Sequence, residues 1–206
     1  MEEARMSMAQ ALLAARASDE TLRERAYSSE TAEGLDLTGL DLADVRFASC
    51  RFTACDFSRA GFVDVAFERC AFVECRFMEA YFRRARFDGC KAEGANFAAA
   101  RLHETALVSA SFRYANFTGG VWERVRAQEC RFTQAALSSL RLSRSAFSAC
   151  DLSGADLFKT PLAGLDLSTC ELAGLVLSDD CSELRGASVS ALQALEIVRL
   201  LGVRVV

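Results

Sequence analysis

Residues 47–77 read FASCRFTACDFSRAGFVDVAFERCAFVECRF, with a phenylalanine at every fifth position. The five-residue step continues in both directions, and every fifth residue from Leu37 to Leu177 is apolar, without an insertion or deletion. The position two residues earlier, from Leu35 to Leu175, holds small or apolar residues and never a charge. Residues 35–179 therefore form one continuous repeat.

A period of five fits neither an α-helix nor a flat strand. Five residues advance a helix by about 500°, so the apolar column would wander over every face. On a strand an odd period would send alternate members of the column to opposite faces. Both conflicts disappear if the chain turns a corner every five residues, with two side chains inward and three outward. This pattern predicts an all-β solenoid of stacked coils.

The cysteines predict how many corners each coil has. Most are separated by multiples of twenty residues, which is expected if four fives make one coil and like residues stack: Cys50, Cys70, Cys90, Cys130, Cys150 and Cys170, with a second pair at Cys55 and Cys75. Nine cysteines in a chain without an export signal argue against a disulfide framework. We expect free thiols that pack inside the coil as small hydrophobic groups, with Cys181 alone outside the pattern.

Several short runs resemble the A(D/N)Lxx unit of pentapeptide-repeat proteins. They are ACDFS (54–58), GANFA (94–98), YANFT (114–118), GADLF (154–158) and GLDLS (164–168). The resemblance implies a right-handed quadrilateral β-helix in which the central residue and the small residue two before it point inward. A fold alone says little about function.

The repeat divides the chain into an N-terminal helical cap (1–34), a pentapeptide-repeat β-helix (35–179) and a C-terminal helix and dimerisation segment (180–206). Met8, Leu12 and Leu13 indicate a first short helix within residues 1–17. Ser18 or Asp19 is placed to cap a second helix through Arg25. The segment is either a lid on the first coil, which protects its open strand edges, or an arm that binds a partner.

Ser188 or Ser190 is placed to cap a C-terminal helix, Gly202 to end it, and Val203–Val206 is strand-like. A capping helix or self-association would explain this apolar segment. The candidate dimer interface consists of Leu192, Leu195, Val198, Leu200, Leu201, Val203 and Val205.

This layout is similar to the gyrase-protecting branch of the family, which includes the Qnr-type, mycobacterial quinolone-resistance and albicidin-resistance proteins. The closing LG-aliphatic-x-V stretch is matched by Leu201, Gly202, Val203 and Val205. The resemblance implies a homodimer joined through the C-termini that binds DNA gyrase or topoisomerase IV by imitating duplex DNA, without binding nucleic acid itself. The array lacks the loops of Qnr-type proteins, so inhibition is expected as readily as protection from antibiotics or self-immunity.

The charge distribution both supports and weakens DNA mimicry. Residues 35–80 have a net charge of −3, residues 81–149 of +6 and residues 150–179 of −4. An acidic saddle in the last block would meet the arginines of a topoisomerase groove. The same aspartates also match the family's repeat unit and are open to a purely structural explanation. The candidate saddle residues are Asp151, Asp156, Asp166, Glu171, Asp179 and Asp180.

The sequence contains no recognisable catalytic, metal or cofactor site. The single histidine, His103, is expected at the surface, the cysteines are not spaced as metal ligands, and no glycine-rich phosphate loop occurs. No apolar run is long enough to span a membrane, and we expect a cytoplasmic protein. The alternative to a topoisomerase inhibitor is a scaffold module with an unrelated protein partner.

Overall fold

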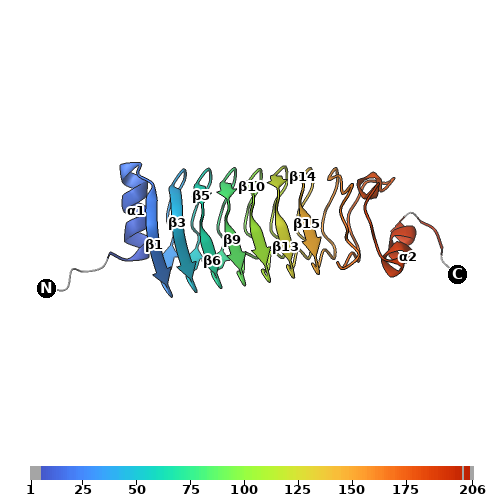
Figure 1. Cartoon of the computed structure of the whole chain (residues 1–206), viewed down its shortest axis with the longest axis horizontal. Coiled ribbons are helices and arrows are strands. Elements are labelled where there is room, and N and C mark those ends of the chain that lie inside the picture. Colours follow the sequence, from blue (N-terminus) through green and yellow to red (C-terminus); the bar gives the residue numbers. More distant parts are fainter. Residues whose placement is uncertain (1–5, 201, 205–206) are drawn as a thin grey trace.

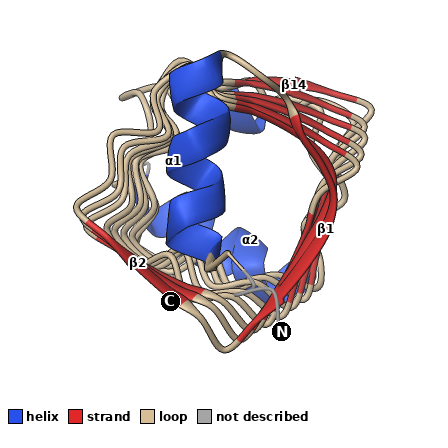
Figure 2. Ribbon diagram, turned by 90° about the vertical axis from the view of Figure 1, so that its left-hand side faces the viewer, coloured by secondary structure: helices blue, strands red, loops and turns tan. Residues whose placement is uncertain are grey.

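The structure, a computed structural model, describes residues 6–200 and 202–204. These residues form a rod of stacked coils, with α1 (Met8–Ser18) across the first coil and α2 (Ala191–Leu200) at the opposite end (Figure 1). Viewed along the rod, the coils have a four-sided outline (Figure 2). The predicted four-sided β-solenoid is confirmed.

Strand pairing explains the four sides. Each strand pairs in parallel with residues twenty positions along the chain, so that Arg101 lies between Tyr81 and Val121. We call the sides A, B, C and D, and each consists of five residues per coil and their counterparts at steps of twenty. In one coil, side A is residues 41–45, side B 46–50, side C 51–55 and side D 56–60.

One sheet covers sides A and B, and a smaller one lies on side C. The first contains, in spatial order, β14 (Arg141–Ser143), β12 (Val121–Glu123), β10 (Arg101–His103), β8 (Tyr81–Arg83), β5 (Gly61–Val63), β3 (Asp41–Ala48), β6 (Ala66–Glu68), β9 (Arg86–Asp88), β11 (Ala106–Val108), β13 (Arg126–Gln128) and β15 (Ala146–Ser148), with β1 (Leu22–Ser28) also paired to β3. The second contains β2 (Thr31–Glu33), β4 (Arg51–Thr53) and β7 (Ala71–Val73). Sides C and D continue along the rod as isolated parallel bridges.

Stacked aromatic rings fill the interior. Phe62 and Phe82, in neighbouring coils, have ring centroids 4.6 Å apart and planes at 6°. Within one coil, Phe52 and Phe57 meet edge to face at 5.6 Å. Buried aromatic rings contribute large apolar areas and favourable ring contacts, so this column provides much of the hydrophobic stabilisation.

Trp122 and Ala127 compensate for each other's size in one coil. Ala127 occupies the column position where the neighbouring coils carry Leu107 and Phe147. The Trp122 indole is buried, and its centroid lies 5.8 Å from that of Phe147, the residue paired with Ala127 in the next coil. A conserved total volume is what a close-packed interior requires.

The N-terminal segment differs from the prediction of a second helix through Arg25. Asp19 instead ends α1 in a left-handed conformation, and β1 follows, with Leu22 beside Leu42 and Tyr27 beside Phe47. The β-helix therefore begins before residue 35. Pairing with β3 and burial of Tyr27 outweigh the helix propensity of this arginine- and glutamate-rich stretch.

The first helix is a lid on this first coil. Ser7 and Gln10 form a capping box, and the Glu30 carboxylate accepts a hydrogen bond from the Met8 N–H at 2.6 Å. Met8 and Leu12 are fully buried against the coil, whereas Leu13 is exposed. Glu30 thus breaks the uncharged column because it binds the helix start.

At the C-terminal end the spacing between paired residues lengthens from twenty to twenty-two, since Asp166 pairs with Ser188. The 3-10 turn η1 (Ser182–Leu184) accommodates the extra residues and buries the Glu183 side chain. Its carboxylate accepts hydrogen bonds from the Lys159 N–H at 2.9 Å and the Ser178 hydroxyl at 2.7 Å. Glu183 therefore satisfies backbone donors that the changed register leaves without a strand partner.

Candidate functional site

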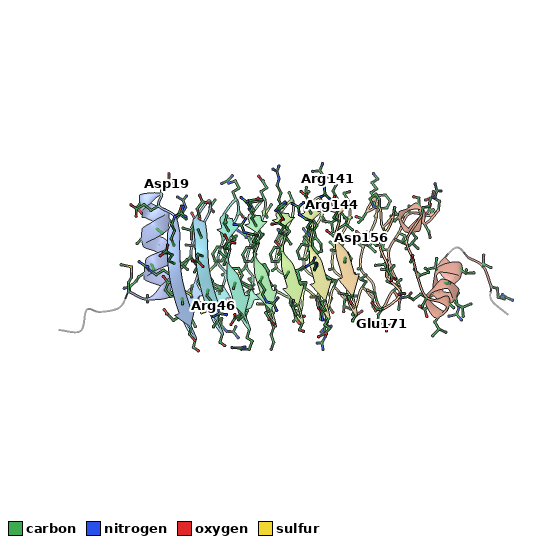
Figure 3. All side chains as sticks on the ribbon, viewed as in Figure 1. Asp19, Arg46, Arg141, Arg144, Asp156 and Glu171 are labelled. Carbon is green, nitrogen blue, oxygen red and sulfur yellow. The ribbon has the colours of Figure 1, made fainter. Side chains whose placement is uncertain are left out.

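The predicted acidic saddle is a collar around the last coils. Asp151 and Glu171 are paired neighbours on side C, Asp156 lies on side D and Asp166 on side B. Asp179 belongs to the exposed edge of side D, and Asp180 follows it. In Figure 3 Glu171 projects from one long edge of the rod, while Arg141 and Arg144 project from the opposite edge. The structure thus places Asp151 and Glu171 together on side C and Asp156 and Asp179 together on side D, with Asp166 apart from them on side B.

Three of these aspartates also stabilise the turns that follow them. One carboxylate oxygen of Asp151, Asp156 or Asp166 accepts the backbone N–H two residues later, in each case at 2.9 Å. Asn96 and Asn116 make the same bond with their amide oxygens. The bond needs a side-chain oxygen but no charge, and Arg76 and Ala136 occupy this position in turns of the same form without it. The turn therefore does not depend on the negative charge, which remains available for a partner.

The hydrogen bonds to these carboxylates favour the ionised form. Those donated by Ser168 lower the pKa of Asp166, and those donated by Ser178 and Ser182 lower the pKa of Asp180. Burial acts to raise the pKa of Asp151, but hydrogen bonds from Ser153 and Thr133 outweigh it and lower the pKa. The collar is negatively charged at neutral pH.

Helix α2 packs loosely on the last coil and leaves an apolar surface. Ser190 and Gln193 form its N-terminal cap, and the Gln193 side chain donates to the carbonyl oxygens of Leu167 and Cys170. Two of its leucines are exposed, Leu192 at 79% and Leu195 at 43%.

The other residues of the candidate dimer interface differ in how exposed they are, and some lie outside the described residues. Val198 is half-buried, and Val203, beyond the end of α2, is 52% exposed. The side chain of Leu200, and Leu201 and Val205 as a whole, lie outside the described residues.

The nine cysteines are free and buried. In the column of Cys50, Cys70 and Cys90, the middle thiol donates to the Phe47 carbonyl oxygen at 3.3 Å. The Cys50 thiol acts to lower the pKa of Cys70, but a hydrogen bond with Cys90 and burial raise it to about 12. A protonated, buried thiol is a packing group with little nucleophilic character.

His103 points outward on side A, in a cluster of charged residues. Its Nε2 atom lies 2.6 Å from the Arg124 guanidinium, which also contacts Glu104 at 3.1 Å and Glu123 at 3.3 Å. No three histidine, cysteine or acidic side chains among the described residues are arranged to hold a metal ion. In the same part of the chain no helix is long and apolar enough to cross a membrane.

Charge counted along the chain does not show how it is distributed around the rod. The arginines of residues 81–149 concentrate on side A, and the buried Glu183 lies outside the repeat. The twenty-residue period would have assigned each arginine to its side. No repeat position signals Glu183.

Comparison with known proteins identifies the repeat. The model of the pentapeptide repeat region matches residues 60–131, and the model of eight pentapeptide repeats matches residues 128–160. No curated protein matches the chain.

Three solved structures give similar coverage at low identity. The chain is 19% identical to QnrB1, a plasmid-mediated fluoroquinolone resistance protein, with 89% of this chain and 100% of that one covered and a TM-score of 0.45. HetL, a protein involved in heterocyst differentiation regulation in Nostoc sp. strain PCC 7120, is 18% identical over 89% and 95% of the two chains, with a TM-score of 0.34. Rfr23 of Cyanothece 51142 is 12% identical over 82% and 88%, with a TM-score of 0.27.

The family assignment rests on the repeat and not on these structural scores. The two matched ranges overlap at residues 128–131 and together span residues 60–160 of the uninterrupted five-residue repeat. The inward and outward positions of that repeat are those of the four-sided coil. The chain therefore belongs to the pentapeptide-repeat family.

Proposed function

We propose that this rod occupies the DNA-binding surface of a type II topoisomerase, DNA gyrase or topoisomerase IV, in place of duplex DNA. Binding inhibits the enzyme or protects it from poisons such as quinolones. The observation that carries the proposal is the charge of residues 150–179, where five carboxylates and one lysine lie on the outside of a rod. Carboxylates on such a surface present the sign of charge that arginine-lined DNA grooves attract.

The shape of the collar suits a groove. Its acids face outward from sides B, C and D, whereas side A of the same coil carries the uncharged Pro161, Ala163 and Gly164. A partner that encloses the rod on three sides would meet all of these charges, and a flat partner only some of them.

A homodimer through α2 would place two collars next to each other. The exposed Leu192 and Leu195 lie at the end of the rod, beyond the last acidic coil. Burial of about two leucine side chains per protomer contributes a few kcal/mol. Joining the rods there doubles the length of the acidic segment and gives it two-fold symmetry, which matches a two-fold symmetric topoisomerase.

The test is a supercoiling assay with purified DNA gyrase, with and without a quinolone, and a parallel decatenation assay with topoisomerase IV. We expect wild-type protein to reduce enzyme activity or the effect of the drug. The triple variant Asp151→Asn, Asp156→Asn, Asp166→Asn should lose at least about tenfold in potency, because it removes three charges and retains the turn oxygens. No effect of wild-type protein on either enzyme would refute the proposal.

A matched control separates charge at the collar from charge in general. Asp36 and Asp56 form the same turn bonds on side D near the other end of the rod. The double variant Asp36→Asn, Asp56→Asn should keep full potency. If both sets of variants inhibit as well as wild type, the collar aspartates serve only the fold, and residues outside the collar bind the topoisomerase.

A further inference from the structure

The basic residues in the middle of the rod gather on one side. Within residues 81–149, side D carries no charged residue, side B carries two basic and two acidic residues, and side C three basic and one acidic. Side A carries two glutamates, Glu104 and Glu123, and six arginines: Arg83, Arg84, Arg101, Arg124, Arg141 and Arg144. Most of the +6 charge of this segment is therefore on side A.

About half of these arginines form no ion pair with an acidic residue that the structure describes. Arg124 binds both glutamates, and Arg84 forms a bidentate pair with Asp64. Arg83, Arg101 and Arg141 are exposed and form no ion pair with any residue that the structure describes. Arg144 has a single contact of 4.0 Å with Glu123, and its side chain is 70% exposed.

The free arginines lie in order along the rod. Strands β8, β10, β12 and β14 are successive neighbours in the sheet. At about 4.8 Å per strand, Arg101 and Arg141 are about 10 Å apart along the axis, and Arg83 and Arg144 about 14 Å. Arg141 and Arg144 stand together on one long edge of the rod (Figure 3).

We propose that side A of these coils, from Arg83 to Arg144, is a binding surface for the phosphate backbone of duplex nucleic acid. A duplex is a straight polyanion with one charge per about 1.7 Å of its axis, and a flat row of cations can lie along it without entering a groove. Arginine binds phosphate through its planar fork of donors. Binding is independent of base sequence.

The surface chemistry favours a duplex over an acidic protein segment. Protein interfaces centre on buried aromatic or aliphatic anchors. At the outward positions of side A from Tyr81 to Arg144, the apolar side chains are Tyr81, which is 40% exposed and carries a hydroxyl group, and Val121, which is half-buried. No aliphatic anchor projects from this surface. The acidic segments 35–80 and 150–179 repel phosphate and confine the contact to the middle of the rod. This inference goes beyond the proposed function, because it requires no topoisomerase. It also departs from the expectation, drawn from the resemblance, that the protein does not bind nucleic acid itself.

The experiment is fluorescence anisotropy of a labelled random-sequence DNA duplex of about two helical turns, titrated with the full-length protein. We expect binding at low salt, with a slope of log K against log salt of about −3 to −4 for four phosphate contacts. The double variant Arg101→Glu, Arg141→Glu should weaken binding at least about tenfold and reduce the slope by about two. Both arginines are exposed and unpaired, so folding should persist, and circular dichroism checks this.

The control is Arg51→Glu, Arg131→Glu, which changes net charge equally on the opposite side C, where both residues are exposed and form no ion pair with a described residue. It should retain most of the binding. Three outcomes would overturn the inference: no binding of the duplex at low salt, equal loss in both double variants, or displacement of the duplex by polyglutamate as readily as by unlabelled DNA. The last would indicate an acidic protein partner instead.

Discussion

At the scale of single residues, the corners of the coil place an unusual demand on the backbone. Each turn needs a residue in the left-handed region, and most of these positions carry side chains other than glycine. Ala99 has φ of 57°, and Gly119, one coil further along at the same corner, has φ of 70°. A non-glycine residue in this region costs roughly 1 kcal/mol. The fold therefore tolerates a strain that recurs along the array.

A pair of substitutions measures this strain. Ala99→Gly should raise the free energy of unfolding by about 0.5–1 kcal/mol, and Gly119→Ala should lower it by a similar amount. A Cβ at Gly119 meets no atom within 4 Å, so only backbone strain is changed. Urea denaturation of both variants checks the prediction. Changes of the same sign would contradict it.

The packing of Trp122 with Ala127 permits a second test at this scale. Trp122→Leu should leave a cavity and lower the free energy of unfolding by about 2–4 kcal/mol. Combining it with Ala127→Phe should recover part of this loss, because Phe is the residue found one coil further along, at Phe147. Thermal unfolding of the two single variants and the double variant gives the coupling energy. Additive effects would show that the two sites are independent.

At the scale of elements, Glu183 closes the last coil. Burial acts to raise the pKa of its carboxyl group, but hydrogen bonds from the Ser178 hydroxyl and the backbone of Lys159 and Ser178 outweigh it, so the pKa lies below the usual 4.5. A lowered pKa in the folded state stabilises the protein above the unfolded pKa. This stabilisation is lost as the pH falls through the lower, folded value.

Glu183→Gln should therefore lower stability at neutral pH by about 1–3 kcal/mol, because the amide cannot accept every one of these hydrogen bonds. The difference between wild type and variant should shrink as the pH falls below about 4.5, where the unfolded carboxyl becomes protonated. Denaturation curves between neutral and acidic pH measure that difference. A difference that stays constant with pH would mean that the ionised carboxylate is not the stabilising species.

The elements also show where a repeat predicts structure and where it does not. The five-residue column predicted the coil because its pattern is strict, and the twenty-residue cysteine spacing predicted four sides. Strand β1 was missed because Arg25 and Glu30 break the uncharged column, although Leu22, Tyr27 and Ala32 continue the apolar one. In the first coil, the position two residues before the apolar column does not have to be buried. Arg25, at this position, is exposed, and Glu30, at the next such position, binds the start of α1.

At the scale of the whole molecule, the residue number of a charged residue fixes its place on the rod in two ways. The number itself gives the segment along the rod, acidic, basic or acidic. The remainder after dividing the residue number by twenty gives the side of the coil. Arg101 and Arg141 share a side because they differ by forty residues, while Asp156 and Asp166 lie on opposite sides because they differ by ten. Counts along the chain alone predicted a saddle, whereas the four-sided coil distributes the same acids into a collar.

The whole-molecule prediction concerns how two rods join. If α2 forms the interface, small-angle X-ray scattering should give a dimer about twice as long as one rod, because the ends of the rods meet. Leu192→Glu combined with Leu195→Glu should yield monomers, since each substitution places a charge in an apolar contact. Leu13→Glu on the exposed face of α1, at the other end, should leave the dimer intact. A dimer no longer than one rod would mean lateral association, in which case the two acidic collars would lie beside each other and not in line.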